Sequence, residues 1–293
     1  TMHIKRLLGR DEEGNLLPEA RRLTRTGETR GMMLVGAPGS GKSHLMDRTL
    51  TKMGPVLEST TETRPLIACP VPSPATFKSM TLALLEESGF ENANPRQEAW
   101  SLWQMFRHRG SMLGTAVVWI DEAQDLFCAD RKLILRALKS LMQGDNAVAV
   151  VLSGTEELAE VIRSDAQVQR RFTAIVLPEM VEAVHGDMYR TVMADYCGRV
   201  GLGSPVEADL IGRIFHGARY RFGRAIELLL LAMEFAIERD DEYLTIDHFA
   251  SAYAMNEACP ASENVFYVDS YYVLDPDAGD DVPTPQSRGK RKG

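Results

Sequence analysis

The sequence predicts an α/β protein in which helices cover both faces of a parallel sheet, followed by a small all-helical domain. Two observations predict this architecture. Up to residue 177, short apolar runs alternate with segments of helical apolar spacing, which is typical of a parallel sheet. After Pro178, helical segments follow one another without a strand between them. The expected parts are an N-terminal segment (1–30), an α/β domain (31–177), a helical domain (178–258) and a partly disordered C-terminal tail (259–293).

Five apolar segments are the candidate strands of the sheet. Each is short and is bounded by turn residues or by the start of a predicted helix. Near-continuous apolar character is typical of strands that are buried on both faces. The segments are GMMLVG (31–36), RPLIACPVP (64–72), TAVVWIDEAQDL (115–126), NAVAVVLSGT (146–155) and TAIVLP (173–178).

Segments of amphipathic spacing are the candidate helices. In the α/β domain they cover residues 42–53, 73–89, 96–110, 130–145 and 155–172. In the helical domain they cover residues 179–200, 204–218, 222–240 and 245–258. Near the N-terminus, Pro18 followed by EARRLTRTGE predicts a short helix that ends before Gly31, since proline is favoured in the first turn of a helix.

The chain is acidic, with 33 Lys and Arg against 41 Asp and Glu and a net charge of −8. This balance argues against a protein that binds nucleic acid through an overall positive field, although a local basic stripe is sufficient for binding. The four cysteines are far apart, no signal-peptide pattern opens the chain, and no apolar run approaches the roughly 18–20 residues of a membrane span. We therefore expect a cytoplasmic protein without membrane contact.

One loop matches the phosphate-binding motif GxxxxGK[ST] in full, where a predicted strand passes into a predicted helix. Glycines let backbone N–H groups turn toward phosphates, and the helix N-terminus favours the same anion. The lysine reaches the β- and γ-phosphates and the serine is a ligand for Mg²⁺. A plain glycine-rich turn is the alternative, and the strand–loop–helix context argues against it. The predicted nucleotide contacts are Gly36, Ala37, Pro38, Gly39, Ser40, Gly41, Lys42, Ser43 and His44, with Ser43 also a metal ligand.

Two acidic residues, Asp121 and Glu122, end the third predicted strand. Carboxyl ends of parallel strands share one edge of a sheet, where ligands bind in open α/β folds. We expect Asp121 to hold Mg²⁺ and Glu122 to orient and polarise a water molecule that attacks ATP. Capping of the following helix is the alternative for this pair, and the phosphate loop in the same sheet argues against it.

These motifs, together with the sequence RRF and a helical domain that contains FGRA, resemble those of AAA+ ATPases over about residues 31–257. Within that superfamily, WIDEAQDL, VVLSGTEELAEVIRSDAQVQRRF and LPEM are most similar to the TniB and TnsC-like transposition regulators, relatives of IstB and MuB. The resemblance implies a P-loop AAA+ fold whose helical domain is a lid, with ATP and Mg²⁺ as cofactors. It also implies an ATPase in which Lys42, Asp121 and Glu122 are catalytic.

The resemblance assigns three further residues to catalysis. Ser153 resembles the sensor 1 residue that contacts the γ-phosphate or the attacking water, with Thr155 as the alternative. Arg171 resembles the arginine finger that enters the site of a neighbouring subunit, with Arg170 as the alternative; the planar fork of arginine suits this role because it donates to several oxygens. Arg224 resembles sensor 2. An ordinary surface or ion-pair role is the alternative for each, and adenine contacts around His3 to Leu8 stay open.

An arginine finger in trans implies a homo-oligomer, since a head-to-tail contact either closes into a ring or continues as a helical filament. The resemblance implies a regulator of DNA transposition that assembles on double-stranded target DNA and recruits or activates a transposase. ATP hydrolysis would then disassemble it, and a target selector of the TniQ type is a further implied partner. Two alternatives stay open: a loader or remodeller for another partner, such as a replicative helicase or a secretion complex, and a nucleotide-switched scaffold with little hydrolysis.

Contacts to DNA are expected from basic and polar residues at helix starts and on helix faces, which bind phosphates without reading bases. The candidates are Thr76, Lys78, Arg107, Arg109, Arg131 and Lys132. Solvated helix faces are the alternative for each of them. In the tail, the aromatic segment NVFYVDSYYVLDP (264–276) has two interpretations, docking onto a partner and packing on the lid. The basic end RGKRKG (288–293) is a candidate for nucleic-acid contact.

Overall fold

The computed structural model describes residues 1–277, apart from the side chains of Cys128 and Ala129. The chain divides into two compact units, the first covering Thr1–Pro178 and the second beginning at Glu179. The N-terminal segment therefore belongs to the same unit as the α/β domain. Among the helices of residues 1–277, none combines the length and the apolar character that a membrane span requires.

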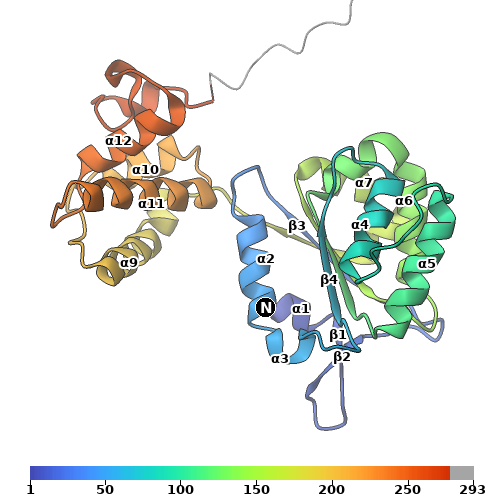
Figure 1. Ribbon diagram of the computed structural model, residues 1–293. Helices are drawn as coiled ribbons and strands as arrows, with labels where there is room; N and C mark the ends of the chain where they lie inside the picture. The colour runs from blue at the N-terminus through green and yellow to red at the C-terminus, as the bar shows by residue number, and fades with distance from the viewer. Residues whose placement is uncertain (278–293) are drawn as a thin grey trace, which may run out of the picture. The chain divides into compact units, whose positions relative to one another are not determined.

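The first unit is built on a parallel sheet. Within the described residues it has five strands in the spatial order β4-β5-β6-β3-β7. Each neighbouring pair is parallel, so helices connect the strands across its faces. The prediction of a parallel sheet between layers of helices is confirmed (Figure 1). The strands are β3 (Gly31–Val35), β4 (Leu66–Pro70), β5 (Val117–Asp121), β6 (Ala149–Gly154) and β7 (Phe172–Val176).

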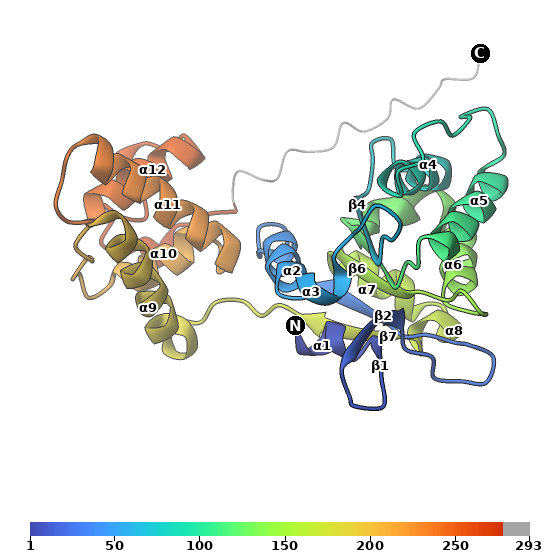
Figure 2. The same ribbon diagram turned by 60° about the horizontal axis from the view of Figure 1, so that its bottom comes forward.

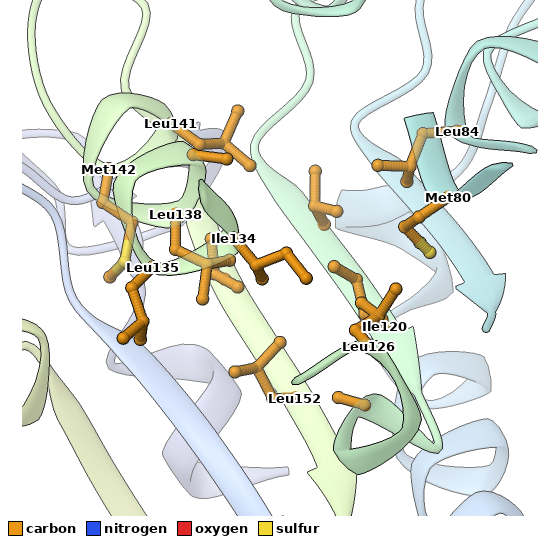
Figure 3. Close-up of a cluster of buried hydrophobic side chains, with 14 of the residues drawn as sticks. Met80, Leu84, Ile120, Leu126, Ile134, Leu135, Leu138, Leu141, Met142 and Leu152 are labelled. Carbon is orange, nitrogen blue, oxygen red and sulfur yellow. The ribbon is translucent and has the colours of Figure 1, made fainter. Parts of the chain in front are cut away.

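Side chains alternate between the two faces of the sheet, and each face has its own apolar cluster. Ile120 and Leu152 face one cluster, in which Ile134 and Leu138 cover the strands (Figure 3). The helices over this face are α4 (Phe77–Glu87), α5 (Ala99–Met112), α6 (Phe127–Leu141) and α7 (Glu156–Arg163). Trp119 faces the opposite cluster, which α1 (Met2–Lys5), α2 (Lys42–Thr51) and α3 (Gly54–Leu57) cover. The central strands β3, β5 and β6 are buried on both faces, which explains their apolar sequences, whereas the edge strands β4 and β7 are partly exposed.

The predicted helix after Pro18 is wrong. Residues 8–20 instead form an antiparallel hairpin of β1 (Leu8–Arg10) and β2 (Leu16–Ala20), which lies beside α1 and α3 (Figure 2). Leu8 and Ala20 are paired and buried against the sheet, so tertiary packing overrides the local preference of this stretch. Pro18 is tolerated because a short two-stranded hairpin leaves edge positions that need no N–H donor.

One predicted helix is interrupted in the structure. The long helix predicted over 155–172 is two helices, α7 and α8 (Ala166–Gln169). The Asp165 carboxylate accepts from the N–H groups of Gln167 and Val168 and so starts α8. An ion pair with Lys139 at 2.8 Å lowers the pKa of Asp165.

The second unit is the predicted helical domain. Its main helices in the described residues are α9 (Glu182–Val200), α10 (Leu210–Gly217), α11 (Phe222–Glu238) and α12 (Ile246–Glu257). They pack around a shared apolar core in which Tyr189 meets Phe215 edge to face with ring centroids 5.2 Å apart. Burial raises the pKa of the Tyr189 hydroxyl, which donates to the carbonyl oxygen of Ala225.

Residues 260–277, here called the C-terminal strap, pack on this helical domain. The strap contains two short 3₁₀ turns, η2 (Ala261–Glu263) and η3 (Tyr271–Val273). Val265 and Phe266 belong to the domain core, so packing on the chain's own lid is the correct interpretation for this part of the aromatic segment. Arg213 and Arg219 donate to carbonyl oxygens of the strap, and Nε2 of His216 lies 2.8 Å from another. The helical domain therefore continues past the predicted boundary at 258, and the basic end at 288–293 lies outside the described residues.

Candidate nucleotide-binding site

The phosphate loop joins the buried strand β3 to helix α2, as the motif predicts. Gly39 and Gly41 have φ values of 74° and 87°, a left-handed conformation that favours glycine. Gly36 is required for another reason, because a Cβ atom there would lie 2.6 Å from Oγ of Ser40. The glycines thus allow a tight turn that ends at the N-terminus of α2, where backbone N–H groups favour an anion.

Donor groups converge in this loop. Lys42 is only 4% exposed, and its Nζ donates to the carbonyl oxygens of Gly36 and Ala37 at 3.0 and 3.2 Å. The buried Oγ of Ser40 has no hydrogen-bond partner among the described residues. An ammonium, a buried hydroxyl and the first N–H groups of a helix are the donor set that a polyphosphate needs. These residues fit the triphosphate of ATP.

Ser43 and Asp121 come together from different elements. Ser43 lies in the first turn of α2, Asp121 ends β5, and the Ser43 hydroxyl donates to Oδ2 of Asp121 at 2.6 Å. Both residues are partly exposed. A hydroxyl and a carboxylate are oxygen ligands of the kind that Mg²⁺ prefers, with phosphate and water completing its shell. The pair fits the predicted metal site.

Ser153 lies behind Asp121. It is fully buried, its hydroxyl donates to Oδ1 of Asp121, and it accepts from Nε1 of Trp119 at 2.8 Å. Thr155 lies just past the end of β6, and its buried Oγ1 has no hydrogen-bond partner within residues 1–277. Of the two sensor 1 candidates, Thr155 is therefore the one whose hydroxyl has no hydrogen-bond partner among the described residues, while the Ser153 hydroxyl is bonded to Asp121.

Glu122 follows Asp121 in a left-handed backbone conformation, with φ 52°. This conformation is unusual for a non-glycine residue and is typical of positions that the surrounding structure over-determines. Nε2 of Gln124 donates to Oε2 of Glu122 at 2.7 Å. Sequence reasoning missed Gln124, although it follows Glu122 by only two residues in the DEAQ segment.

The two adjacent arginines before β7 have different surroundings. The Arg171 side chain is 8% exposed; it contacts Oε1 of Glu28 at 2.6 Å and the carbonyl oxygen of Lys139 at 3.2 Å. The Arg170 side chain is 63% exposed and lies 3.1 Å from the same Glu28 oxygen. A residue that enters a neighbouring subunit must be accessible, so this burial argues against Arg171 and for Arg170 as the arginine finger. Glu28 is a second residue that sequence reasoning missed.

Arg224 belongs to the second unit, where it is the third residue of α11. It lines a polar pocket of about 480 Å³ together with Glu227, Asn256 and Glu257. Arg224 makes no hydrogen bond or ion pair with any residue that the structure describes. A guanidinium without an internal partner suits a ligand contact, and its sensor 2 role stays a prediction.

Two of the predicted DNA contacts hold helices in place. Thr76 is the N-cap of α4 and accepts from the N–H of Ser79 at 3.0 Å. Arg109 donates to the carbonyl oxygens of Ser88 and Gly89 at 2.9 and 3.0 Å and so closes the end of α4. The other candidates have side chains that solvent reaches, and they are Lys78, Arg107, Arg131 and Lys132.

The expected adenine contacts near the N-terminus are also restricted by burial. Ile4, Leu7 and Leu8 belong to the cluster under the sheet, so they contribute to the core. His3, Lys5 and Arg6 keep solvent access. These polar side chains are therefore the ones in this segment that solvent and a ligand can reach.

The fold and the phosphate-loop site together define a P-loop protein of the AAA+ class, with a parallel sheet in the order found here and a helical domain after it. The chain belongs to the TniB family, because the family model described as "Bacterial TniB protein" matches residues 15–182. No curated protein matches the chain.

Several solved structures have a similar fold. The Aeropyrum pernix ORC1 protein in complex with DNA is 18% identical with a TM-score of 0.58, and the match covers 80% of this chain and 61% of that one. Cdc6p from Pyrobaculum aerophilum is 13% identical with a TM-score of 0.56, covering 79% and 64%. The Thermotoga maritima RuvB Holliday junction branch migration motor is 15% identical with a TM-score of 0.50, covering 84% and 67%. The chain thus spans less than two thirds of the ORC1 and Cdc6p chains, and these likenesses concern the fold.

Proposed function

We propose that this protein is an ATP-dependent, DNA-binding regulator of transposition. In this proposal it oligomerises on double-stranded target DNA, recruits or activates a transposase, and disassembles when ATP is hydrolysed. The observation that carries the proposal is the contact of Ser43 with Asp121 beside an intact Glu122, in a chain of the TniB family. A target selector of the TniQ type is a further proposed partner.

In the proposed hydrolysis, Lys42 and the N–H groups of the phosphate loop bind the triphosphate. Ser43 and Asp121 would hold Mg²⁺, which neutralises charge that develops on the phosphate oxygens. Glu122 would accept a proton from the attacking water, so that water and not another substrate receives the γ-phosphoryl group. Thr155 is proposed as the sensor 1 contact, because its hydroxyl has no hydrogen-bond partner among the described residues, whereas the Ser153 hydroxyl donates to Asp121.

Assembly is proposed to depend on Arg170. Its exposed guanidinium would enter the site of the next subunit and donate to the γ-phosphate. Each subunit both receives and supplies an arginine, so the contact is head to tail and builds a ring or a filament. ATP would then stabilise the interface, and hydrolysis would weaken it.

DNA binding is proposed to rest on a few cations from each subunit. With a net charge of −8, a single subunit has no overall attraction to DNA. Lys78 is the leading contact, since it lies in the first turn of α4 and its side chain reaches solvent. Repetition of weak contacts along an assembly raises the overall affinity. The solved DNA complex of the ORC1 protein is in accord with a DNA-associated role for this fold.

ATP-dependent assembly on DNA is the main expected result. With ATP or a slowly hydrolysed analogue, negative-stain microscopy should show rings or filaments on double-stranded DNA at low salt, and none with ADP. The mixture without nucleotide is the matched control, because a lone acidic subunit should bind DNA poorly. DNA binding that is absent with ATP, or equally strong without it, would contradict the proposal.

Replacement of Lys78 by alanine should weaken DNA binding by the assembly while ATP binding stays unchanged. Loss of one phosphate contact per subunit should reduce the slope of log K against log salt by about 1 for each subunit that contacts DNA. Fluorescence anisotropy with labelled duplex at several salt concentrations measures this slope. Arg109→Ala is the contrasting variant, since loss of its bonds to Ser88 and Gly89 should lower Tm and leave the slope unchanged. If Lys78→Ala has the same salt dependence of DNA binding as the wild type, Lys78 does not contact DNA.

A further inference from the structure

Gln124 connects two parts of the candidate site. Its amide Nε2 donates to Oε2 of Glu122 at 2.7 Å. Its amide Oε1 accepts from the backbone N–H of Thr155 at 3.3 Å. One side chain therefore contacts both the carboxylate after β5 and the residue that follows β6. Among the described residues, no other hydrogen bond joins this carboxylate to the end of β6.

The backbone on both sides of the Gln124 side chain fits its contacts with Glu122 and Thr155. Gln124 lies in the 3₁₀ turn η1 (Ala123–Leu126), which begins directly after the left-handed Glu122. On the opposite side, a Cβ atom on Gly154 would lie 2.4 Å from Oε1 of Gln124. The amide therefore fits against β6 only because residue 154 is glycine. A side chain that only filled surface space would not need such a close approach.

We infer that Gln124 is a positioning residue that orients Glu122 for hydrolysis and ties it to the end of β6. The amide binds one oxygen of the Glu122 carboxylate, which leaves the other oxygen to accept a proton from water. Because the second amide contact is the N–H of Thr155, the carboxylate is aligned with the residue proposed to contact the γ-phosphate. The inference rests on the proposed ATPase function, and it assigns no contact with ATP to Gln124 itself.

Loss of this amide should misplace Glu122 without removing it. Misplacement of a reacting group by about 1 Å can cost on the order of 100-fold, so Gln124→Ala should lower kcat for ATP by roughly 10- to 100-fold. KM and the affinity for a fluorescent ATP analogue should stay within about twofold, because the phosphate loop is untouched. Steady-state hydrolysis and analogue titration measure these quantities, with Tm recorded for every variant. A merely structural role would lower Tm or change KM together with kcat.

Gly154→Ala tests the same contact through the residue against which the Gln124 amide packs. The added methyl group would displace the flexible Gln124 amide, so this variant should also lower kcat. In the double variant Gln124→Ala/Gly154→Ala, the combined loss should be smaller than the sum of the single losses, because the amide that the methyl group displaces is already absent and only its approach to the Leu158 side chain, at 3.0 Å from Cδ2, remains. Additive losses would show that Gly154 acts on its own and would overturn the link between the two positions.

Asp125→Asn is the matched control. Asp125 is exposed, and its Oδ1 lies 3.4 Å from Nε2 of Gln124, a longer contact than that of Glu122. The variant should keep wild-type kcat. A loss of kcat as large as that of Gln124→Ala would show that the contact of the Gln124 amide with Asp125, and not that with Glu122, matters for hydrolysis. Wild-type kcat in Gln124→Ala would overturn the inference alone. Absence of hydrolysis in the assembled wild-type protein would overturn the proposed function and this inference with it.

Discussion

Replacement of Arg170 by alanine is expected to slow ATP hydrolysis in the DNA-bound assembly by about 10³-fold or more, the contribution typical of an arginine finger. The Arg170 side chain is 63% exposed, so its loss should leave Tm and nucleotide binding by a single subunit unchanged. Hydrolysis measured at increasing protein concentration separates the effect on the assembled protein from the effect on nucleotide binding by a single subunit. Mixing Arg170→Ala with a variant that cannot bind ATP, Lys42→Ala, provides a further check. An Arg170→Ala subunit binds ATP but has no finger, whereas a Lys42→Ala subunit has a finger but binds no ATP. Where a Lys42→Ala subunit donates its arginine to an Arg170→Ala subunit, the site is complete, so mixing should restore part of the activity.

Arg171→Ala should behave differently because Arg171 is buried. Its guanidinium contacts Glu28, whose side chain is 19% exposed, and the carbonyl oxygen of Lys139. Hydrogen bonds to charged groups typically contribute about 1.5–3 kcal/mol, and this is the expected loss, because Glu28 keeps its contact with Arg170 and is not left as an unpaired buried charge. Thermal or denaturant unfolding measures this loss. A stable Arg171→Ala protein that assembles but does not hydrolyse ATP, beside an active Arg170→Ala protein, would reverse the assignment.

Replacement of Glu122 by glutamine is expected to lower hydrolysis by about 10²- to 10⁴-fold, the usual contribution of a general base. Glutamine keeps the size of the side chain but cannot accept a proton from water. ATP binding should persist, because Lys42 and Ser43 are unchanged. DNA-bound assemblies should therefore accumulate and dissociate slowly after dilution into ATP-free buffer, as followed by light scattering.

The control for this trapped state is Lys42→Ala. Loss of the ammonium that lies inside the phosphate loop should abolish ATP binding and, with it, assembly. If Glu122→Gln assemblies dissociate as quickly as those of the wild type, hydrolysis at Glu122 does not control disassembly. The switch from assembled to free protein would then have to be assigned to nucleotide exchange.

The sheet and the phosphate loop could be predicted from sequence because their signals are local. The central strands β3, β5 and β6 are buried on both faces and apolar, and the loop favours glycine where the backbone is left-handed, as at Gly41. The N-terminal hairpin could not be predicted in this way. Its formation depends on Leu8 and Ala20 packing against a sheet whose strands come later in the chain.

The choice between neighbouring candidates also depended on distant residues. Nothing in RRF distinguishes Arg170 from Arg171. Both contact Glu28, and the difference is that Arg171 is buried and also donates to the carbonyl oxygen of Lys139, which is far away in the sequence. Similarly, Ser153 matches the expected position of sensor 1, but Trp119 and Asp121 occupy its hydroxyl. Sequence patterns predict the helix or strand on which a residue lies, but only the three-dimensional structure shows which groups its side chain contacts.

The C-terminal strap has a consequence for synthesis of the protein on the ribosome. Helical domains usually fold fast because their contacts are local. Here the core of the second unit lacks Val265 and Phe266, and α10 lacks the carbonyl partners of Arg213, until the chain has grown through the strap. A nascent chain that has just completed α12 would carry a buried arginine without these partners, which is costly. The helical domain therefore reaches its native state only after synthesis has passed through the strap.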